Sequence, residues 1–192
     1  MKPPFAVKGL HHYAFRCRDA EETRHFYEDL LGLPLVHVIK ADHVPSTGEY
    51  CPYVHIFFEM ADGSCIAFFD LGDDQKALPS PNTPSWVNHI AMQVDTVEEI
   101  EAAIKRLSDA GYEVLGVTDH DFVKSMYVFD PNGLRFELTT PTGSAAYMAD
   151  ARANAHRLCQ EWTERKRQLA SQKPNARRPA GGEGQSAQER GR

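Results

Sequence analysis

The sequence predicts an α+β fold of two βαβββ modules, followed by a C-terminal helix and a disordered tail. Three observations lead to this prediction. A short apolar run with a histidine near its start occurs twice, at 9–15 and 86–94, followed each time by an acidic turn and a helical pattern. A Pro-rich stretch at 71–85 separates the copies. An Ala-rich segment at 143–171 precedes a tail at 172–192. The tail has no large apolar residue, so it has too little apolar surface to bury for a stable fold.

The first module covers about residues 8–70, and its elements follow in order. A strand is expected at 8–16, and Asp19 is a suitable N-cap for a helix at 20–31. Gly32 and then Pro34 end that helix. The remaining elements are expected to be a strand at 35–43, a loop at 44–52, and two strands at 53–60 and 65–69 joined by an Asp-Gly turn.

The second module covers about residues 86–140 and completes a domain that spans residues 1–142. A strand at 87–94 leads to a helix that begins near Thr96 and ends near Ala110. Three strands are expected after it, near 112–117, 123–129 and 134–139. The C-terminal helix carries one apolar stripe, which predicts packing on the domain or on a partner: Met148, Ala151, Ala155, Leu158, Trp162 and Leu169.

Composition and charge exclude several classes of function. The 192 residues carry a net charge of −6, which argues against binding to nucleic acid or to an anionic membrane. No apolar run approaches the roughly 20 residues that span a bilayer, and the N-terminus lacks the apolar core of a secretion signal. The four cysteines are widely spaced without a Cys-x-x-Cys pair, so a reduced, cytoplasmic protein is expected.

The repeat places two histidines and one carboxylate where they can meet. His12 and His89 lie at equivalent points of the two copies, and Glu137 lies inside the last strand of the second. Glu137 stands between apolar neighbours, where an unpaired carboxylate would be costly. Two histidines and one carboxylate form the facial triad of non-haem Fe(II) oxygenases, which leaves coordination positions open. We therefore predict a metal site of these three residues, with Fe(II) expected and Mn(II) or Zn(II) compatible with the same ligands.

The duplication and the placement of these three residues resemble the vicinal oxygen chelate superfamily. That superfamily includes glyoxalase I, bleomycin-resistance proteins and extradiol dioxygenases. The resemblance covers about residues 8–140, and its helix signature reads Arg-His-Phe-Tyr-Glu-Asp-Leu-Leu-Gly-Leu at 24–33. It implies that each module forms half of an open barrel and that the halves enclose a metal. It also implies a homodimer or a higher homo-oligomer.

Within the superfamily the chain looks most like the one-domain type I extradiol dioxygenases. The strand at 87–94 resembles their metal-histidine strand. Tyr127 stands where they carry a tyrosine that contacts the substrate, and His120 stands near a further active-site histidine. The resemblance thus implies a non-haem Fe(II) dioxygenase that opens a catecholic ring with O2. The chain departs from these enzymes at Gly63-Ser64, where they carry a catalytic histidine, and His55 on the neighbouring strand is the candidate replacement.

Two other functions remain open from the sequence. A glyoxalase-like lyase or isomerase, or a thiol transferase, could use the same three metal ligands without O2. A binding protein of the bleomycin-resistance type would hold a small aromatic ligand with no metal and no turnover. Metal content and a requirement for O2 distinguish the three functions.

Overall fold

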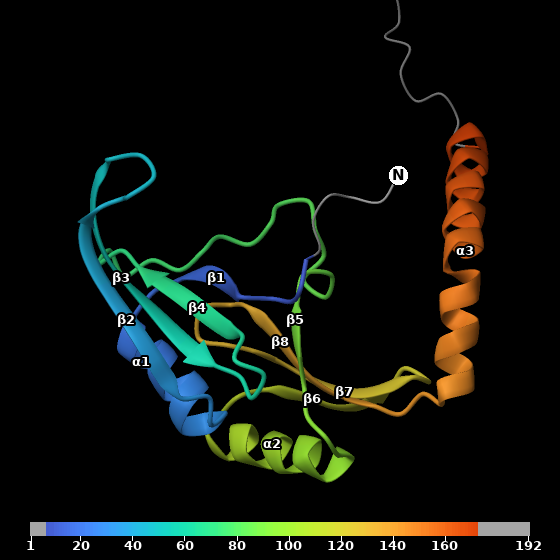
Figure 1. Ribbon diagram of the computed structural model, residues 1–192, viewed down its shortest axis with the longest axis horizontal. Helices are drawn as coiled ribbons and strands as arrows, with labels where there is room; N and C mark the ends of the chain where they lie inside the picture. The colour runs from blue at the N-terminus through green and yellow to red at the C-terminus, as the bar shows by residue number, and fades with distance from the viewer. Residues whose placement is uncertain (1–6, 173–192) are drawn as a thin grey trace, which may run out of the picture. The chain divides into compact units, whose positions relative to one another are not determined.

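The computed structural model of the chain describes residues 7–172, which divide after Gly143 into two compact units. The first unit contains two four-stranded sheets, each with helical segments beside it (Figure 1). The second consists of one long helix, α3 (Ala145–Gln172), whose first turn is capped by the Ser144 hydroxyl accepting from the Tyr147 amide at 3.1 Å. The predicted α+β class and C-terminal helix are confirmed, and the predicted tail lies outside the described residues from 173 onward.

The first module forms a sheet with the strand order β1-β4-β3-β2. Strand β1 runs parallel to β4, and the other neighbours are antiparallel. A wider π-type turn, η1, continues the short helix α1. The bounds are β1 (His12–Cys17), α1 (Ala20–Arg24), η1 (His25–Leu30), β2 (Leu35–His43), β3 (Tyr50–Glu59) and β4 (Cys65–Asp70).

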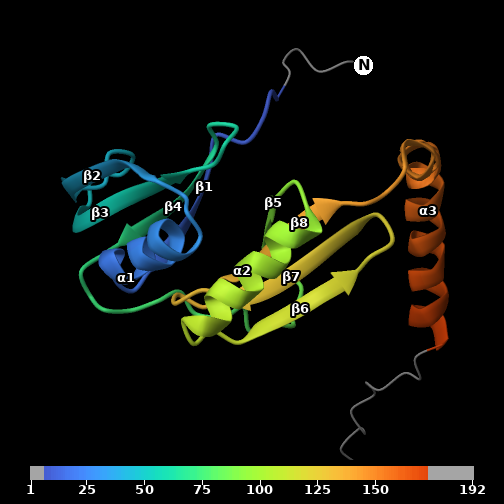
Figure 2. The same cartoon turned by 90° about the horizontal axis from the view of Figure 1, so that it is seen from below.

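The second module repeats the topology with the strand order β5-β8-β7-β6. Its helix α2 begins with a capping box, in which Thr96 and Glu99 each satisfy the other's backbone amide. Figure 2 shows α2 lying across this sheet. The bounds are β5 (Ile90–Gln93), α2 (Val97–Asp109), β6 (Val114–Asp119), β7 (Val123–Phe129) and β8 (Arg135–Pro141).

Several predicted boundaries were wrong by a few residues. The loop expected at 44–52 is shorter, because His43 pairs with Tyr50 and extends the β2–β3 hairpin. Pro52 fits in β3 because it lies at a register shift, where it has no pairing partner that needs its missing amide. Strands β1 and β5 are shorter than expected, so His12 begins its strand and His89 immediately precedes its own.

The helical segment of the first module joins both modules into one core. Tyr27 is fully buried, and its ring lies 4.9 Å from Phe68 of β4 and 6.3 Å from Phe136 of β8. Its hydroxyl donates to the buried Asp130 at 3.0 Å, and Asn132 donates to Thr23 at 3.1 Å. The core faces of the two sheets therefore meet the same helical segment.

Strand alternation then decides which residues face away from this core. In β8, Phe136 and Leu138 belong to the core, so Glu137 between them faces the other side of its sheet. In β4, Ile66 and Phe68 belong to the core, so Ala67 faces away. The candidate site residues of each module thus lie on the face of the sheet opposite to the shared core.

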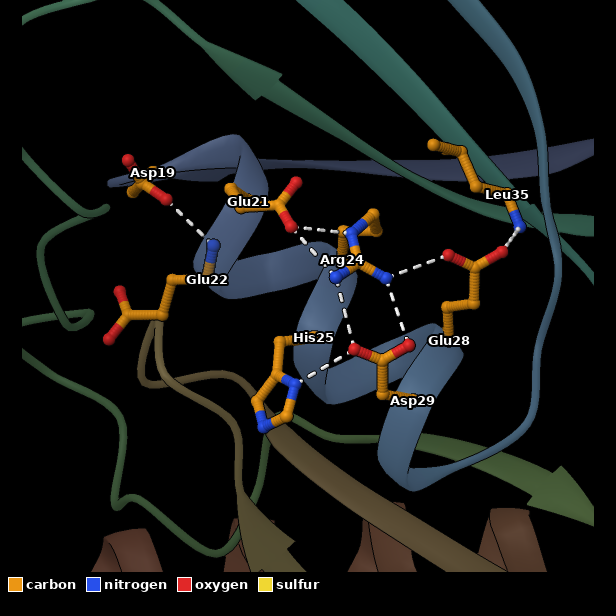
Figure 3. A network of polar contacts seen from close by, with 8 residues as sticks. All are labelled: Asp19, Glu21, Glu22, Arg24, His25, Glu28, Asp29 and Leu35. Carbon is orange, nitrogen blue, oxygen red and sulfur yellow. Dashed lines mark hydrogen bonds and ion pairs between the residues drawn. The ribbon is translucent and has the colours of Figure 1, made fainter.

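Arg24 organises a network of polar contacts on the surface of the α1–η1 segment (Figure 3). Its guanidinium donates to Glu21 at 2.7 Å, to Glu28 at 2.9 Å and to both oxygens of Asp29 at 2.9 and 3.0 Å. Hydrogen bonds from Arg24 and then from His25 lower the pKa of Asp29 to about 2. Glu28 also accepts from the Leu35 amide at 3.0 Å, which ties the helical segment to the start of β2.

Replacing Arg24 is expected to make the free energy of unfolding less dependent on pH in the acidic range. Because the folded-state pKa of Asp29 lies below its ordinary value, its stabilising contribution is present above about pH 4 and is lost as the pH falls toward 2. In Arg24→Met the pKa of Asp29 should rise toward its ordinary value, and the loss of unfolding free energy over that range should shrink. Carboxyl NMR titration and denaturant unfolding at several pH values measure both, with Arg18→Met, which removes the separate Arg18–Glu22 ion pair, as the control. An unchanged Asp29 titration in Arg24→Met would contradict this assignment.

Candidate metal centre

Four of the predicted site residues form one cluster in the second module. His89 Nε2 lies 3.2 Å from Glu137 Oε2, and the Tyr127 hydroxyl donates to Glu137 Oε1 at 3.2 Å. His120 Nε2 lies 2.8 Å from the Tyr127 oxygen. Glu137 is 5% exposed, and Tyr127 is its neighbour across the β7–β8 ladder. Predicted residues that are up to 48 positions apart in sequence therefore lie side by side.

The hydrogen bond of His89 to Val87 defines the tautomer of its ring. Its Nδ1 lies 2.9 Å from the Val87 carbonyl oxygen, which can only accept, so Nδ1 carries a proton. In the neutral ring Nε2 then has a lone pair directed at a carboxylate oxygen. Two such acceptor atoms need a proton or a cation between them, and a backbone carbonyl on the second nitrogen is the usual outer partner of a metal-binding histidine. His89 and Glu137 thus fit two positions of a divalent metal site.

Tyr127 connects the metal candidates to a second titratable group. Since its hydroxyl donates to Glu137, its oxygen accepts from His120, which gives the chain His120 to Tyr127 to Glu137. Burial, followed by the charge of Glu137, raises the pKa of Tyr127, so this phenol stays protonated near neutral pH. The Arg135 guanidinium lies over the Tyr127 ring, 4.1 Å from its centre, in a cation–π contact.

The remaining predicted residues, His12 and His55, form a separate cluster in the first module. The His12 ring lies 6.1 Å from the His55 ring and 5.5 Å from the Phe57 ring. His55 stacks on Phe69 with ring centres 3.6 Å apart and planes 7° from parallel. His12 Nδ1 also lies 2.8 Å from Nδ1 of the adjacent His11, so one of these two nitrogens donates and the other accepts. The cluster therefore combines the imidazole rings of His12 and His55 with the phenyl rings of Phe57 and Phe69.

His55 is held as a neutral ring with a defined tautomer. Its Nδ1 lies 3.0 Å from the Phe68 carbonyl oxygen and therefore donates, which leaves Nε2 as a base. Burial, together with the nearby His12 and His37, lowers the pKa of His55. A neutral imidazole with one fixed donor and one lone pair is the form that a general base requires.

The two clusters do not combine within one chain. Among residues 7–172 no group of three or more His, Cys, Asp or Glu side chains is close enough to bind a metal. The physical reason is the shared core, because both clusters lie on sheet faces turned away from it. The structure therefore brings His89 to Glu137 and leaves His12 with His55.

A hollow of the described chain lies away from both clusters. It has a volume of about 870 Å³ and is lined by residues that include Leu33, Met60, Met92, Phe136 and Leu138. Phe136 and Leu138 belong to the core face of β8, whereas Glu137 lies on the opposite face. None of the predicted site residues lines this hollow.

Two features of the site were not anticipated from the sequence. Arg135 lies two residues before Glu137 on β8, so strand alternation alone places it on the same face and could have identified it. Ser64 occupies the position at which extradiol enzymes carry a histidine. Its hydroxyl and amide both bind Asp62 Oδ1, at 2.6 and 2.9 Å, so the residue closes the β3–β4 turn and is not available for proton transfer.

Comparisons with known proteins agree on the family. The family described as Glyoxalase/Bleomycin resistance protein/Dioxygenase superfamily matches residues 9–138. A curated Bacillus subtilis protein, named "Putative ring-cleaving dioxygenase MhqA", is 24% identical over 136 residues, which cover 71% of this chain and 40% of that protein. The chain thus spans less than half of that relative.

None of the helices within residues 7–172 has the length and apolar character of a membrane span.

Solved structures share the fold at low sequence identity. A glyoxalase/dioxygenase from Nostoc punctiforme is 21% identical, with a TM-score of 0.54 over 74% of this chain and 97% of its own. The fosfomycin resistance protein FosX from Listeria monocytogenes, solved with Mn(II) and sulfate, is 20% identical, with a TM-score of 0.53 over 75% and 99%. These structures show the shared fold. The family match, which covers about two thirds of the sequence, shows that the chain belongs to the glyoxalase/bleomycin resistance/dioxygenase superfamily, also called the vicinal oxygen chelate superfamily.

Proposed function

We propose that the protein is a metal-dependent dioxygenase of the extradiol type, which opens the ring of a small catecholic aromatic with O2. The observation that carries the proposal is the contact between His89 and Glu137, in which the Val87 carbonyl fixes the histidine tautomer that a metal requires. Non-haem Fe(II), the expected metal, would supply open coordination positions for the substrate oxygens and O2. The similarity to a protein named as a ring-cleaving dioxygenase supports the choice of reaction.

The neighbouring side chains have definite roles in this proposal. Tyr127 is protonated and touches Glu137, so it can donate a hydrogen bond to a substrate oxygen beside the metal. His120 can return a proton to Tyr127 through their 2.8 Å contact. His55 supplies the neutral base that Ser64 cannot provide. The rings of Phe57 and Phe69 pack against the His55 ring.

His12 and His55 reach the metal in this proposal through a second copy of the chain. Within one described chain the first-module cluster and the His89–Glu137 pair lie on sheet faces turned away from one core. A homodimer in which the first module of one copy faces the second module of the other would unite His12 with His89 and Glu137. Exposed apolar side chains on the same faces, Ile39 of β2 opposite His55 and Leu115 of β6 opposite Tyr127, at 38% and 59%, are consistent with sheets that face a partner. The free state of all four cysteines supports a reducing compartment such as the cytoplasm.

Metal analysis tests the proposed function directly. Protein purified without O2 is expected to hold about one Fe per chain and to consume O2 with a catechol, and His89→Ala should lose both the metal and the activity. The control is His156→Ala, which removes an exposed histidine of α3 and should leave both unchanged.

Each other outcome points to a different member of the superfamily. Bound Mn or Zn with turnover in the absence of O2 would replace the dioxygenase by a lyase, isomerase or thiol transferase. Absence of metal and turnover in the wild-type protein, with tight binding of an aromatic ligand, would replace it by a binding protein.

A further inference from the structure

The apolar stripe of α3 follows a seven-residue repeat. Its members fall at alternating steps of three and four residues, which are the a and d positions of a heptad. The a positions are Met148, Ala155, Trp162 and Leu169, and the d positions are Ala151, Leu158 and Arg165. A strict seven-residue repeat is the pattern of a left-handed coiled coil, and it continues through about three heptads of one unbroken helix.

No other described part of the second unit covers this seam. The four large members, Met148, Leu158, Trp162 and Leu169, are 48%, 51%, 53% and 47% exposed. The single polar member, Arg165, lies 5.9 Å from the Trp162 ring, so its apolar stem can cover the seam while its charged head reaches water. A single helix that exposes four large apolar side chains along one line can bury them only against a partner surface.

The flanking charges identify the partner and its direction. The e positions are Arg152, Cys159 and Lys166, and Glu161 is a g position. In a parallel pair of identical helices each g residue faces the e residue five positions later on the other chain, so Glu161 meets Lys166 twice. In an antiparallel pair the e positions face each other, so Arg152 and Lys166 would repel.

We infer that α3 forms a parallel two-stranded coiled coil with α3 of a second copy of this chain. Burying the large seam residues drives the association, and the two Glu161–Lys166 pairs set its direction. The small residues Ala151 and Ala155 allow the two helices to approach closely at the N-terminal end of the seam. This inference does not depend on the ring-opening activity, because none of the seam residues belongs to the metal centre.

Cysteine cross-linking of the full chain tests the pairing. In a Cys159→Ser background, Ala151→Cys at a d position should form a disulfide-linked dimer under mild oxidation. The matched control is Ala153→Cys, an equally exposed alanine at the outer f position, which should link at least about tenfold more slowly. The Cys159→Ser parent shows any background from the other three cysteines.

Equilibrium association provides the second measurement. Leu158→Asp should weaken self-association by about tenfold or more, whereas Ala153→Asp should not. Equal cross-linking of Ala151→Cys and Ala153→Cys, or self-association unaffected by Leu158→Asp, would overturn the coiled coil. Because metal content is measured separately, failure of the coiled coil is distinguishable from failure of the proposed dioxygenase.

Discussion

A mixture of two inactive variants, His12→Ala and His89→Ala, is expected to regain about one quarter of the wild-type ring-opening activity. Each variant alone should be inactive, because each homodimer lacks one ligand in both of its sites. If the first module of one copy meets the second module of the other, half of the randomly paired dimers contain both variants. In each such dimer one site carries two intact modules and the other carries both defects.

Co-expression or reversible unfolding of the two variants allows the subunits to pair at random. The activity and the metal content of the mixture should rise together relative to either variant alone. The control is a mixture of His89→Ala with Glu137→Gln, since both residues lie in the same module and no pairing can restore the site. Activity in neither mixture, from variants that remain folded and dimeric, would contradict a site shared between copies.

Asp130→Ala is expected to lower the free energy of unfolding by about 3–4 kcal/mol. Asp130 is 4% exposed and accepts from the Tyr27 hydroxyl, from the Leu134 amide at 2.7 Å and from the Asn132 amide at 2.9 Å. Removing the carboxyl group would leave these donors without their partner inside the core. The contact with Tyr27 also joins the two modules, so its loss weakens the interface between them.

Two further variants separate the hydrogen bonds from the charge. Burial raises the pKa of Asp130, which shows that the environment disfavours the ionised form. Asp130→Asn keeps an acceptor oxygen and a similar shape, so it should cost less, about 1–2 kcal/mol. Asp109→Ala, at an exposed position of α2, should change stability by no more than about 0.5 kcal/mol. Urea unfolding measures all three, and a cost for Asp130→Ala as small as that for Asp109→Ala would contradict the role of this network.

Local patterns in the sequence were sufficient to predict most elements of the fold. The N-cap at Asp19, the helix start near Thr96 and the turn at Gly63 depend on nearest neighbours, and the structure contains each of them. The start of β3 and the length of β5 were predicted less well. Both depend on pairing with distant strands, as when Tyr50 joins the sheet opposite His43.

The candidate site was predicted in part for the same reason. Strand alternation was enough to predict the face on which Glu137 lies. Its contacts with Tyr127 and His89 depend also on the β7–β8 register and on the parallel pairing of β5 with β8. The partners of His55 could not be predicted, because its tautomer depends on the Phe68 carbonyl of another strand. The structural role of Ser64 likewise became visible only with its bonds to Asp62.

The sequence by itself determined the two βαβββ modules, the residue types of the candidate metal centre and the apolar stripe of α3. Each of these depends only on the spacing of nearby residues and on the internal repeat. Only the tertiary structure decided which faces of the two sheets are buried. The packing of Tyr27 against both Phe68 and Phe136 turns the core faces toward one helical segment. Because strand alternation places the polar residues opposite those faces, His12 is separated from His89 and Glu137, and our proposed site requires two copies of the chain.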